Sequence, residues 1–154
     1  MTQHRGVEPA EQAAAMMTAA GMPRMPARVL MALIAAPAGG YTASELADRL
    51  GVSAAAVSGA VRYLQTLHFI QRRSQHGHRR DRYELVHDTF YGSVASNAPV
   101  YDRMADYIDR IQDEQTDDPD AAARAADMAA FFRFMAERMP RLVEEWEQSR
   151  RSGG

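Results

Sequence analysis

The chain has 154 residues, of which 46% are hydrophobic and 25% charged, a composition that suits one soluble domain with its own core. It contains no cysteine, which excludes disulfides, thiolate metal ligands and a cysteine nucleophile. No apolar run approaches the ~20 residues that cross a bilayer, and the N-terminus lacks a signal-peptide core, so we expect a cytoplasmic protein with no membrane partner.

The formal net charge of −2 hides an uneven distribution along the chain. Residues 24–87 hold nine arginines and four acidic residues, a net charge of +5, whereas residues 88–149 hold six arginines and fourteen acidic residues, a net charge of −8. A basic middle followed by an acidic tail is typical of a protein with one surface for a polyanion.

Two helices are predicted before residue 41. Residues 8–20 are rich in alanine and methionine, which favour helix, and Gly21, Met22 and Pro23 end that helix. Pro26, in a first helical turn, starts a second helix that reaches Ile34, and the segment 37–40 ends it.

Residues 42–67 predict two short helices about a glycine turn. Thr42 is a good N-cap, and Glu45 three residues later completes a capping box. Gly51 supplies a left-handed corner, and Ser53 caps a second helix with apolar residues at helical spacing (Val57, Ala60, Val61, Leu64 and Leu67). This pattern indicates a helix-turn-helix, and His68 at its end is expected to be partly buried.

A hairpin and two further helices are predicted to follow. Residues 69–73 and 82–86 indicate two strands, joined by a polar loop over residues 74–81 with a central glycine. Asp88 can cap a helix that kinks or restarts at Pro99, residues 115–120 form a connector, and a last helix over residues 121–148 is expected to be interrupted near Pro140. The predicted fold class is therefore mainly α with a small β-hairpin wing, flanked by N- and C-terminal helices.

Residues 24–86 resemble the MarR family of winged helix-turn-helix regulators, and in particular its GbsR-like branch. The resemblance is carried by the lead-in over residues 22–28, by the spacing of Ala47, Gly51 and Val57, and by an arginine-rich wing before an Arg-Tyr strand. In place of the Asp-x-Arg pattern common in the family, the wing here has Arg79-Arg80-Asp81-Arg82.

The resemblance implies a homodimer whose terminal helices interlock, with recognition helices in successive major grooves and wing tips near minor grooves. It implies a single MarR-like domain over residues 1–154, with a DNA-binding lobe at 24–87 and a helical dimerisation lobe at 8–21 and 88–149. The predicted function is a sequence-specific, double-stranded DNA-binding transcriptional regulator that acts as a dimer on a pseudo-palindromic operator.

The residues predicted to contact DNA lie on the second helix of the helix-turn-helix, at helix starts and in the wing. Small side chains on the outward helix face permit close approach to base edges, and Arg62 can bind guanine or a phosphate. Hydroxyl groups near helix starts can donate to phosphates. The full set is Thr42, Ser44, Ser53, Ala55, Ser58, Arg62, Arg72, Arg73, Arg79, Arg80 and Arg82.

Other functions remain as alternatives or are disfavoured. A winged helix can instead serve as an adaptor for protein–protein interaction without binding DNA, although five wing arginines within eleven residues favour DNA. No nucleophile elbow, Walker loop or dinucleotide fingerprint is present, so neither an enzyme nor a cofactor is predicted. His76, His78 and His87 raise the question of zinc, but a zinc site needs three or four ligands and no cysteine or helical His-x-x-x-His lies nearby, so no metal is predicted.

The aromatic and methionine side chains of the C-terminal half are predicted to form core and dimer interface. The family resemblance would place a small-molecule effector pocket between the dimerisation helices and the DNA-binding lobe. The sequence selects neither an effector nor an operator, and it does not distinguish a repressor from an activator.

Overall fold

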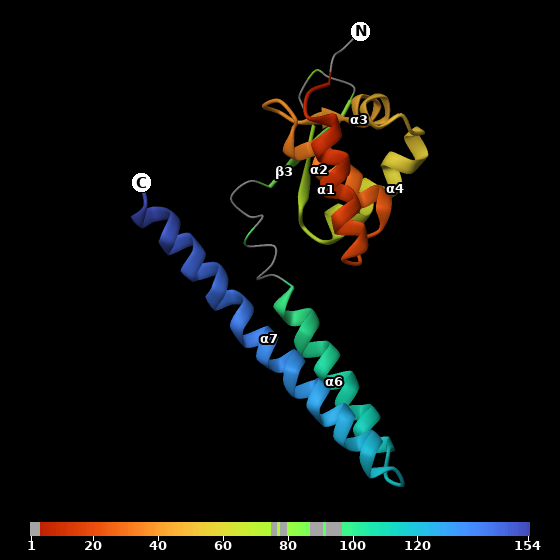
Figure 1. Cartoon of the computed structure of the whole chain (residues 1–154), viewed down its shortest axis with the longest axis vertical. Coiled ribbons are helices and arrows are strands. Elements are labelled where there is room, and N and C mark those ends of the chain that lie inside the picture. Colours follow the sequence, from red (N-terminus) through yellow and green to blue (C-terminus); the bar gives the residue numbers. More distant parts are fainter. Residues whose placement is uncertain (1–3, 75–76, 78–79, 87–90, 92–96) are drawn as a thin grey trace. The chain divides into compact units, whose positions relative to one another are not determined.

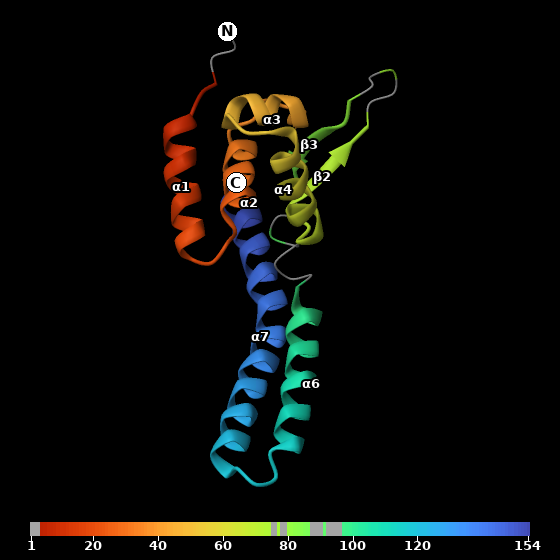
Figure 2. The ribbon, with the colours of Figure 1, turned by 90° about the vertical axis from the view of Figure 1, so that its right-hand side faces the viewer.

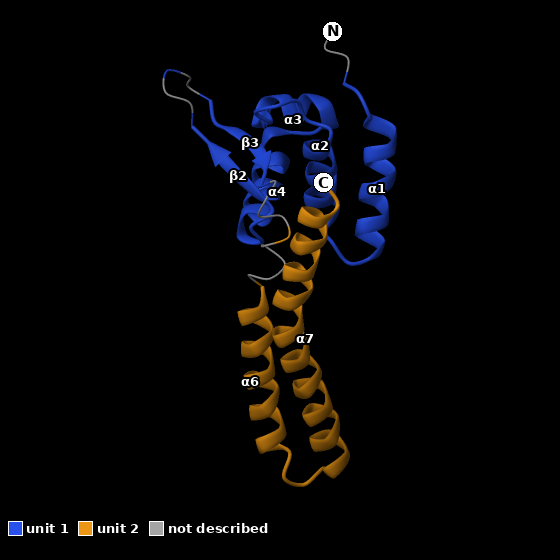
Figure 3. Cartoon of the chain, turned by 90° about the vertical axis from the view of Figure 1, so that its left-hand side faces the viewer, with its two compact units in different colours: residues 1–90 blue, residues 91–154 orange. Residues whose placement is uncertain are grey.

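The structure, a computed structural model, describes residues 4–74, 77, 80–86, 91 and 97–154 and divides into two compact units, residues 1–90 and 91–154 (Figure 3). The elements of the first unit (Figure 1) are α1 (Val7–Ala19), α2 (Arg24–Ile34), β1 (Tyr41–Thr42), α3 (Ala43–Leu50), α4 (Ala54–Thr66), β2 (Ile70–Arg73) and β3 (Arg82–Leu85). Those of the second unit are α6 (Ala98–Glu114) and α7 (Pro119–Ser152). The predicted class, mainly helical with a small β-hairpin wing, is confirmed.

An apolar core joins α2, α3, α4 and the sheet of the first unit. Leu30 of α2, Leu46 of α3 and both Val57 and Leu64 of α4 are fully buried, and Ile70 of β2 closes the cluster from the side of the sheet. Burial of these side chains contributes about 1.5–3 kcal/mol each, so this core fixes how the three helices cross.

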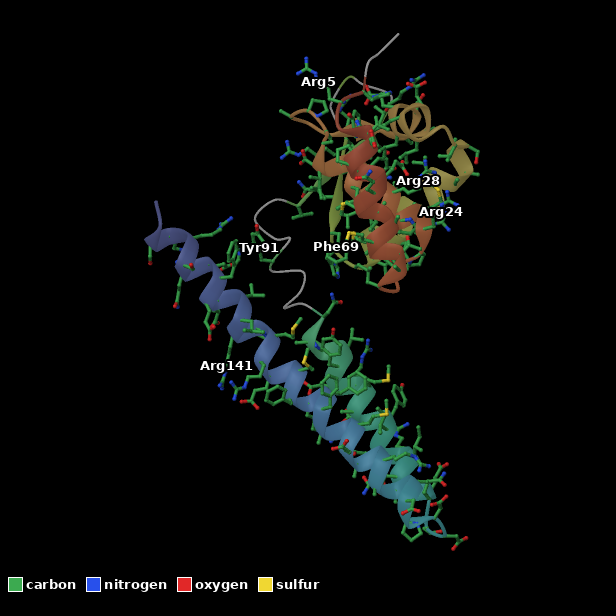
Figure 4. The ribbon with its side chains drawn as sticks, viewed as in Figure 1. Arg5, Arg24, Arg28, Phe69, Tyr91 and Arg141 are labelled. Atoms are coloured by element: carbon green, nitrogen blue, oxygen red, sulfur yellow. The ribbon has the colours of Figure 1, made fainter. Side chains whose placement is uncertain are left out.

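Helix α1 packs along α2, where the two helices lie side by side (Figure 2). Arg28 of α2 is labelled in Figure 4. It donates from Nε to the carboxylate of Glu11 on α1, at 2.8 Å, and from Nη2 to the carbonyl of Leu50 at the end of α3, at 2.9 Å. The helix assigned from sequence to the dimerisation lobe is therefore tied to the helix-turn-helix within the first unit.

The predicted caps of α3 and α4 are confirmed. The Thr42 hydroxyl accepts from the Glu45 N–H at 3.1 Å, and the Glu45 carboxylate accepts from the Thr42 N–H at 2.7 Å, which completes the capping box. Gly51 ends α3 in a left-handed conformation with φ of 65°, and the Ser53 hydroxyl accepts from the Ala56 N–H at 3.2 Å. Local sequence thus sets the start and the end of the turn between the two helices.

The sheet has three antiparallel strands in the order β1-β3-β2. β1 was not predicted, because a two-residue strand leaves no periodicity to detect. It pairs Tyr41 with Tyr83 and Thr42 with Arg82, and it follows a corner in which Gly39 and Gly40 have φ of 90° and 74°. This pairing brings the base of the wing against the start of α3.

The expectation that His68 is partly buried is wrong. α4 ends at Thr66, and His68 is exposed with φ of 60°, the left-handed conformation that usually favours glycine. The N–H of Phe69 donates to the carbonyl of Leu64 at 3.1 Å, so a reversal of the chain ends the helix before His68 can turn inward.

In the second unit, α6 and α7 lie side by side as an antiparallel pair (Figures 1 and 2). Their contact buries Ala105 and Ile108 of α6 against Ala125 and Ala129 of α7. At the surface Arg133 pairs with Asp106 and Asp109, and the hydrogen bond to Asp109 raises the pKa of Arg133. None of the helices in the described ranges is both long and apolar enough to cross a membrane.

The two prolines of the C-terminal half behave differently. Pro99 lies in the first turn of α6, as a helix start there requires. Residues 87–90 and 92–96, including the predicted cap Asp88, lie outside the described residues, so the predicted kink or restart stays a prediction. The predicted interruption near Pro140 is wrong, because α7 continues through it. A proline inside a helix removes one backbone donor and costs about 3 kcal/mol. In α7 the helical turns before and after Pro140 are sufficient to keep the helix continuous.

Replacement of Gly40 by alanine should destabilise the first unit strongly. A Cβ at this position would lie 1.8 Å from the Tyr83 carbonyl oxygen, and the φ of 74° strains any L side chain. We expect Gly40→Ala to lower the free energy of unfolding by at least about 2 kcal/mol in urea denaturation at fixed protein concentration. Gly59→Ala is the control, because its Cβ meets nothing within 4 Å on α4, and it should raise stability by about 0.5–1 kcal/mol. Equal effects of the two changes would contradict the close packing at the corner.

Candidate nucleic-acid interface

The outward face of α4 carries small side chains and one arginine, and Tyr63 is exposed at its edge. Val57, Ala60, Val61 and Leu64 are buried in the core, and the helical repeat therefore turns Ala55, Ser58, Gly59 and Arg62 outward, where all four are exposed. The Arg62 guanidinium makes no ion pair with any described residue. A narrow helix face with one free cation is the shape that enters a groove of a duplex.

Two of the residues predicted to contact DNA, Thr42 and Ser44, differ in exposure at the start of α3. Thr42 is only 8% exposed and its hydroxyl is engaged by the cap, whereas Ser44 is exposed on the first turn. Ser44 and Arg80 line the same shallow groove of about 300 Å³, together with Thr42 and Asp81. The structure thus brings Arg80 of the wing next to the start of α3, and Arg80 has no ion-pair partner among the described residues.

The arginines of β2 are exposed but already paired. Arg72 lies 3.4 Å from the Asp81 carboxylate, and Arg73 lies 2.5 Å from Glu84, which also accepts from the Gln71 amide at 2.6 Å. The antiparallel register places Gln71 directly opposite Glu84. The contact between these two residues could therefore have been predicted from the hairpin pattern in the sequence. Both guanidinium groups are thus engaged by carboxylates of the hairpin, and their predicted contact with DNA stays a prediction.

Two arginines of the basic segment point into the protein instead. Arg82 donates to the carbonyls of Gly39 and Gly40 and to the Glu45 carboxylate. Arg49 is only 7% exposed, contacts Tyr41 at the hydroxyl and over the ring, and leaves Nη2 without a hydrogen-bond partner in the described part of the chain. Sequence reasoning missed all three partners of Arg82, because they lie 37 to 43 residues earlier in the chain.

Several residues considered from sequence lie outside the described residues. They are Arg79 of the wing tip and the three histidines weighed as metal ligands, His76, His78 and His87. Within the described ranges, no group of three or more histidine or acidic side chains is arranged to hold a metal ion.

Comparison with known proteins covers both units. A model described as the MarR family matches residues 20–81, and a model described as an MmpR5-like MarR family transcriptional regulator matches residues 88–149. The chain belongs to the MarR family of transcriptional regulators. No curated protein matches it.

A similar fold is found in a solved structure described as the crystal structure of a transcriptional regulator. That structure is similar to this chain with a TM-score of 0.81 and 21% sequence identity, over 92% of this chain and 98% of the other. The MarR assignment and the winged-helix fold agree with a protein that binds DNA and regulates transcription. The GbsR-like branch stays a prediction, since the second matching model is MmpR5-like.

Charge at the start of α4 should affect DNA binding by this MarR protein without affecting its fold. Asparagine and aspartate cap helices about as well as serine, so Ser53→Asn and Ser53→Asp should each change stability by less than about 0.5 kcal/mol. Only aspartate adds a negative charge next to a phosphate, so Ser53→Asp should lower affinity at least about tenfold while Ser53→Asn stays near the wild type. The measurement is fluorescence anisotropy with a duplex that the wild-type protein selects from random-sequence DNA, here termed the selected duplex. Equal affinities of the two variants would show that this helix start does not face DNA.

Proposed function

We propose that this MarR-family regulator binds a pseudo-palindromic operator as a homodimer, with α4 of each subunit in a major groove and the wing near a minor groove. The observation that carries the proposal is the exposed face of α4, which has small side chains and a single unpaired arginine. A helix must present a narrow face to reach base edges in a groove about 12 Å wide.

Base recognition by this face is expected to be limited. Arg62 is its one long polar side chain, and it can form a bidentate pair with guanine or bind a phosphate. Ser53, Ser44 and the amides at the helix starts are suited to phosphates, which position the protein without reading sequence. The remaining specificity is assigned to groove shape sensed by wing arginines, of which Arg80 has no ion-pair partner among the residues that the structure describes.

Arg62→Ala should weaken binding to the selected duplex much more than binding to an unrelated duplex of equal length. The loss of one bidentate pair costs about 1–3 kcal/mol, so we expect a 5- to 150-fold fall in affinity for the selected duplex and a change below about threefold for the other. Arg124→Ala, an exposed arginine of α7 in the other unit, is the control and should leave both affinities unchanged. If Arg62→Ala lowered both affinities equally, Arg62 would be a phosphate contact and not a reader of sequence.

The homodimer is supported by apolar side chains that the second unit leaves exposed. Along α6 they are Val100, Met104, Tyr107 and Ile111, and along α7 they are Met128, Phe131, Phe134, Leu142 and Trp146. Phe131 alone is 57% exposed. On both helices most of these positions are displaced from the buried seam in the same rotational sense, which in an antiparallel pair places them on one side. A contiguous apolar surface of this kind marks an interface.

A second copy of the chain is the occupant that best suits this surface. Regulators on pseudo-palindromic sites are two-fold symmetric, and two half-sites one helical turn apart, roughly 34 Å, must be bound together. A two-fold contact is self-complementary, so an apolar row on one subunit meets the same row on the other.

Phe131→Asp should therefore dissociate the dimer. A buried unpaired carboxylate costs several kcal/mol, and we expect the dissociation constant of the dimer to rise at least about 100-fold. Ala130→Asp is the matched control, because this exposed neighbour lies on the side of α7 away from Met128, Phe131 and Leu142. Light scattering coupled to size exclusion should give a monomer for the first variant and a dimer for the second and the wild type. A dimeric Phe131→Asp variant would place the subunit contact elsewhere.

A further inference from the structure

We propose that Arg82 is a positioning residue, which holds the wing against the start of α3, and that Glu45 is its essential partner. The inference rests on the proposed role of the wing in binding DNA. It replaces the sequence prediction that Arg82 itself contacts DNA.

The guanidinium of Arg82 joins three segments. Its Nε donates to the Gly39 carbonyl at 3.1 Å, and its Nη2 donates to the Gly40 carbonyl at 2.8 Å and to the Glu45 carboxylate at 3.2 Å. The side chain is only 28% exposed, and its donors are directed at the corner between α2 and β1 and at the first turn of α3. We call this set of contacts the Arg82 clamp.

The clamp closes a ring that includes the cap of α3. The same oxygen of Glu45, Oε2, accepts from the Thr42 N–H at 2.7 Å and from Arg82 at 3.2 Å. Thr42 is also the backbone partner of Arg82 in the pairing of β1 with β3. Strand register, helix cap and ion pair therefore depend on one carboxylate, and a change in one of them reaches the other two.

The corner accepts an arginine because of its backbone. Gly39 and Gly40 both have left-handed φ, and Gly40 lies against the Tyr83 carbonyl where no Cβ fits. Both carbonyls are thereby presented to the side chain of Arg82. A planar fork with several donors can reach two carbonyls and a carboxylate at once, whereas a lysine ammonium cannot keep all three distances.

The clamp matters for DNA because of what precedes it in the chain. Arg80 and Asp81 come directly before Arg82, and Arg80 lies in the groove that it shares with Ser44. When Arg82 is fixed, the backbone position from which the Arg80 side chain extends is therefore fixed as well. With the clamp, the base of the wing is ordered when the protein folds. Without the clamp, it would have to be ordered when DNA binds, and the lost conformational entropy would weaken binding.

Neutralising Glu45 distinguishes the clamp from a simple charge effect, because the two predict opposite changes in DNA affinity. Neutralising an acidic side chain beside a polyanion ordinarily strengthens binding, whereas loss of the clamp should weaken it. We expect Glu45→Gln, whose amide oxygen can still accept from Thr42, to lower affinity for the selected duplex about tenfold. Asp48→Asn is the matched control on the same helix. Asp48 contacts His4 at 3.0 Å and takes no part in the clamp, so its neutralisation should leave affinity unchanged or raise it.

Arg82→Lys completes the experiment. A lysine would preserve most of a phosphate contact, so a variant that binds as tightly as the wild type would overturn the proposal. We expect instead a loss equal to that of Glu45→Gln, no added loss in the double variant, and a much smaller effect of Arg80→Ala in the Arg82→Lys background than in the wild type. Additive losses, or tighter binding by Glu45→Gln, would also overturn it.

A second readout separates the clamp from the proposed function. Unfolding by urea in the absence of DNA should show the same non-additive cycle for Arg82→Lys and Glu45→Gln. If the wild-type protein retained no duplex at low salt, the proposed function would fail. In that case an additive unfolding cycle would refute the clamp, and a coupled cycle would keep it as a feature of the fold.

Discussion

The packing of α4 on the core determines which side chains this helix exposes. Val57, Val61 and Leu64 enter the core shared with Leu30 and Leu46, and a helix with 3.6 residues per turn then has no freedom to turn the opposite face inward. The cap at Ser53 fixes where the helix begins, and so fixes the rotation of every later residue. The face of α4 that we propose for DNA is therefore a consequence of burial on the other side of the same helix.

The arginines of the basic segment also differ in whether their guanidinium groups are engaged by other parts of the protein. A count of charges along the chain correctly indicated a polyanion-binding protein, yet it could not say which guanidinium groups are free. Arg28 binds the Leu50 carbonyl at the end of α3 and Glu11 of α1, Arg82 binds the corner before α3 and Glu45, and Arg49 is buried against Tyr41. Their partners are contributed by residues distant in sequence, so composition and spacing carried no signal for them.

Features fixed by neighbouring residues were the ones that sequence could predict. The capping box at Thr42, the corner at Gly51 and the cap at Ser53 each involve residues within four positions, and all agree with the structure. β1 was missed because it exists only through pairing with β3, and the break expected at Pro140 was wrong because tertiary and helical context exceeded the cost of one lost donor. The site residues followed the same division, since the face of α4 was predictable and the role of Arg82 was not.

The second unit shows why sequence alone could not separate core from interface. Its aromatic and methionine residues were predicted as one group, but the seam between α6 and α7 is made chiefly of small side chains such as Ala105, Ala125 and Ala129. Phe132 packs against this seam, whereas its neighbour Phe131 is exposed, because adjacent helical residues point about 100° apart. Two helices that approach through alanines leave their largest apolar groups outside. A hairpin built in this way cannot bury its own apolar surface, and a further layer of protein is the arrangement that does.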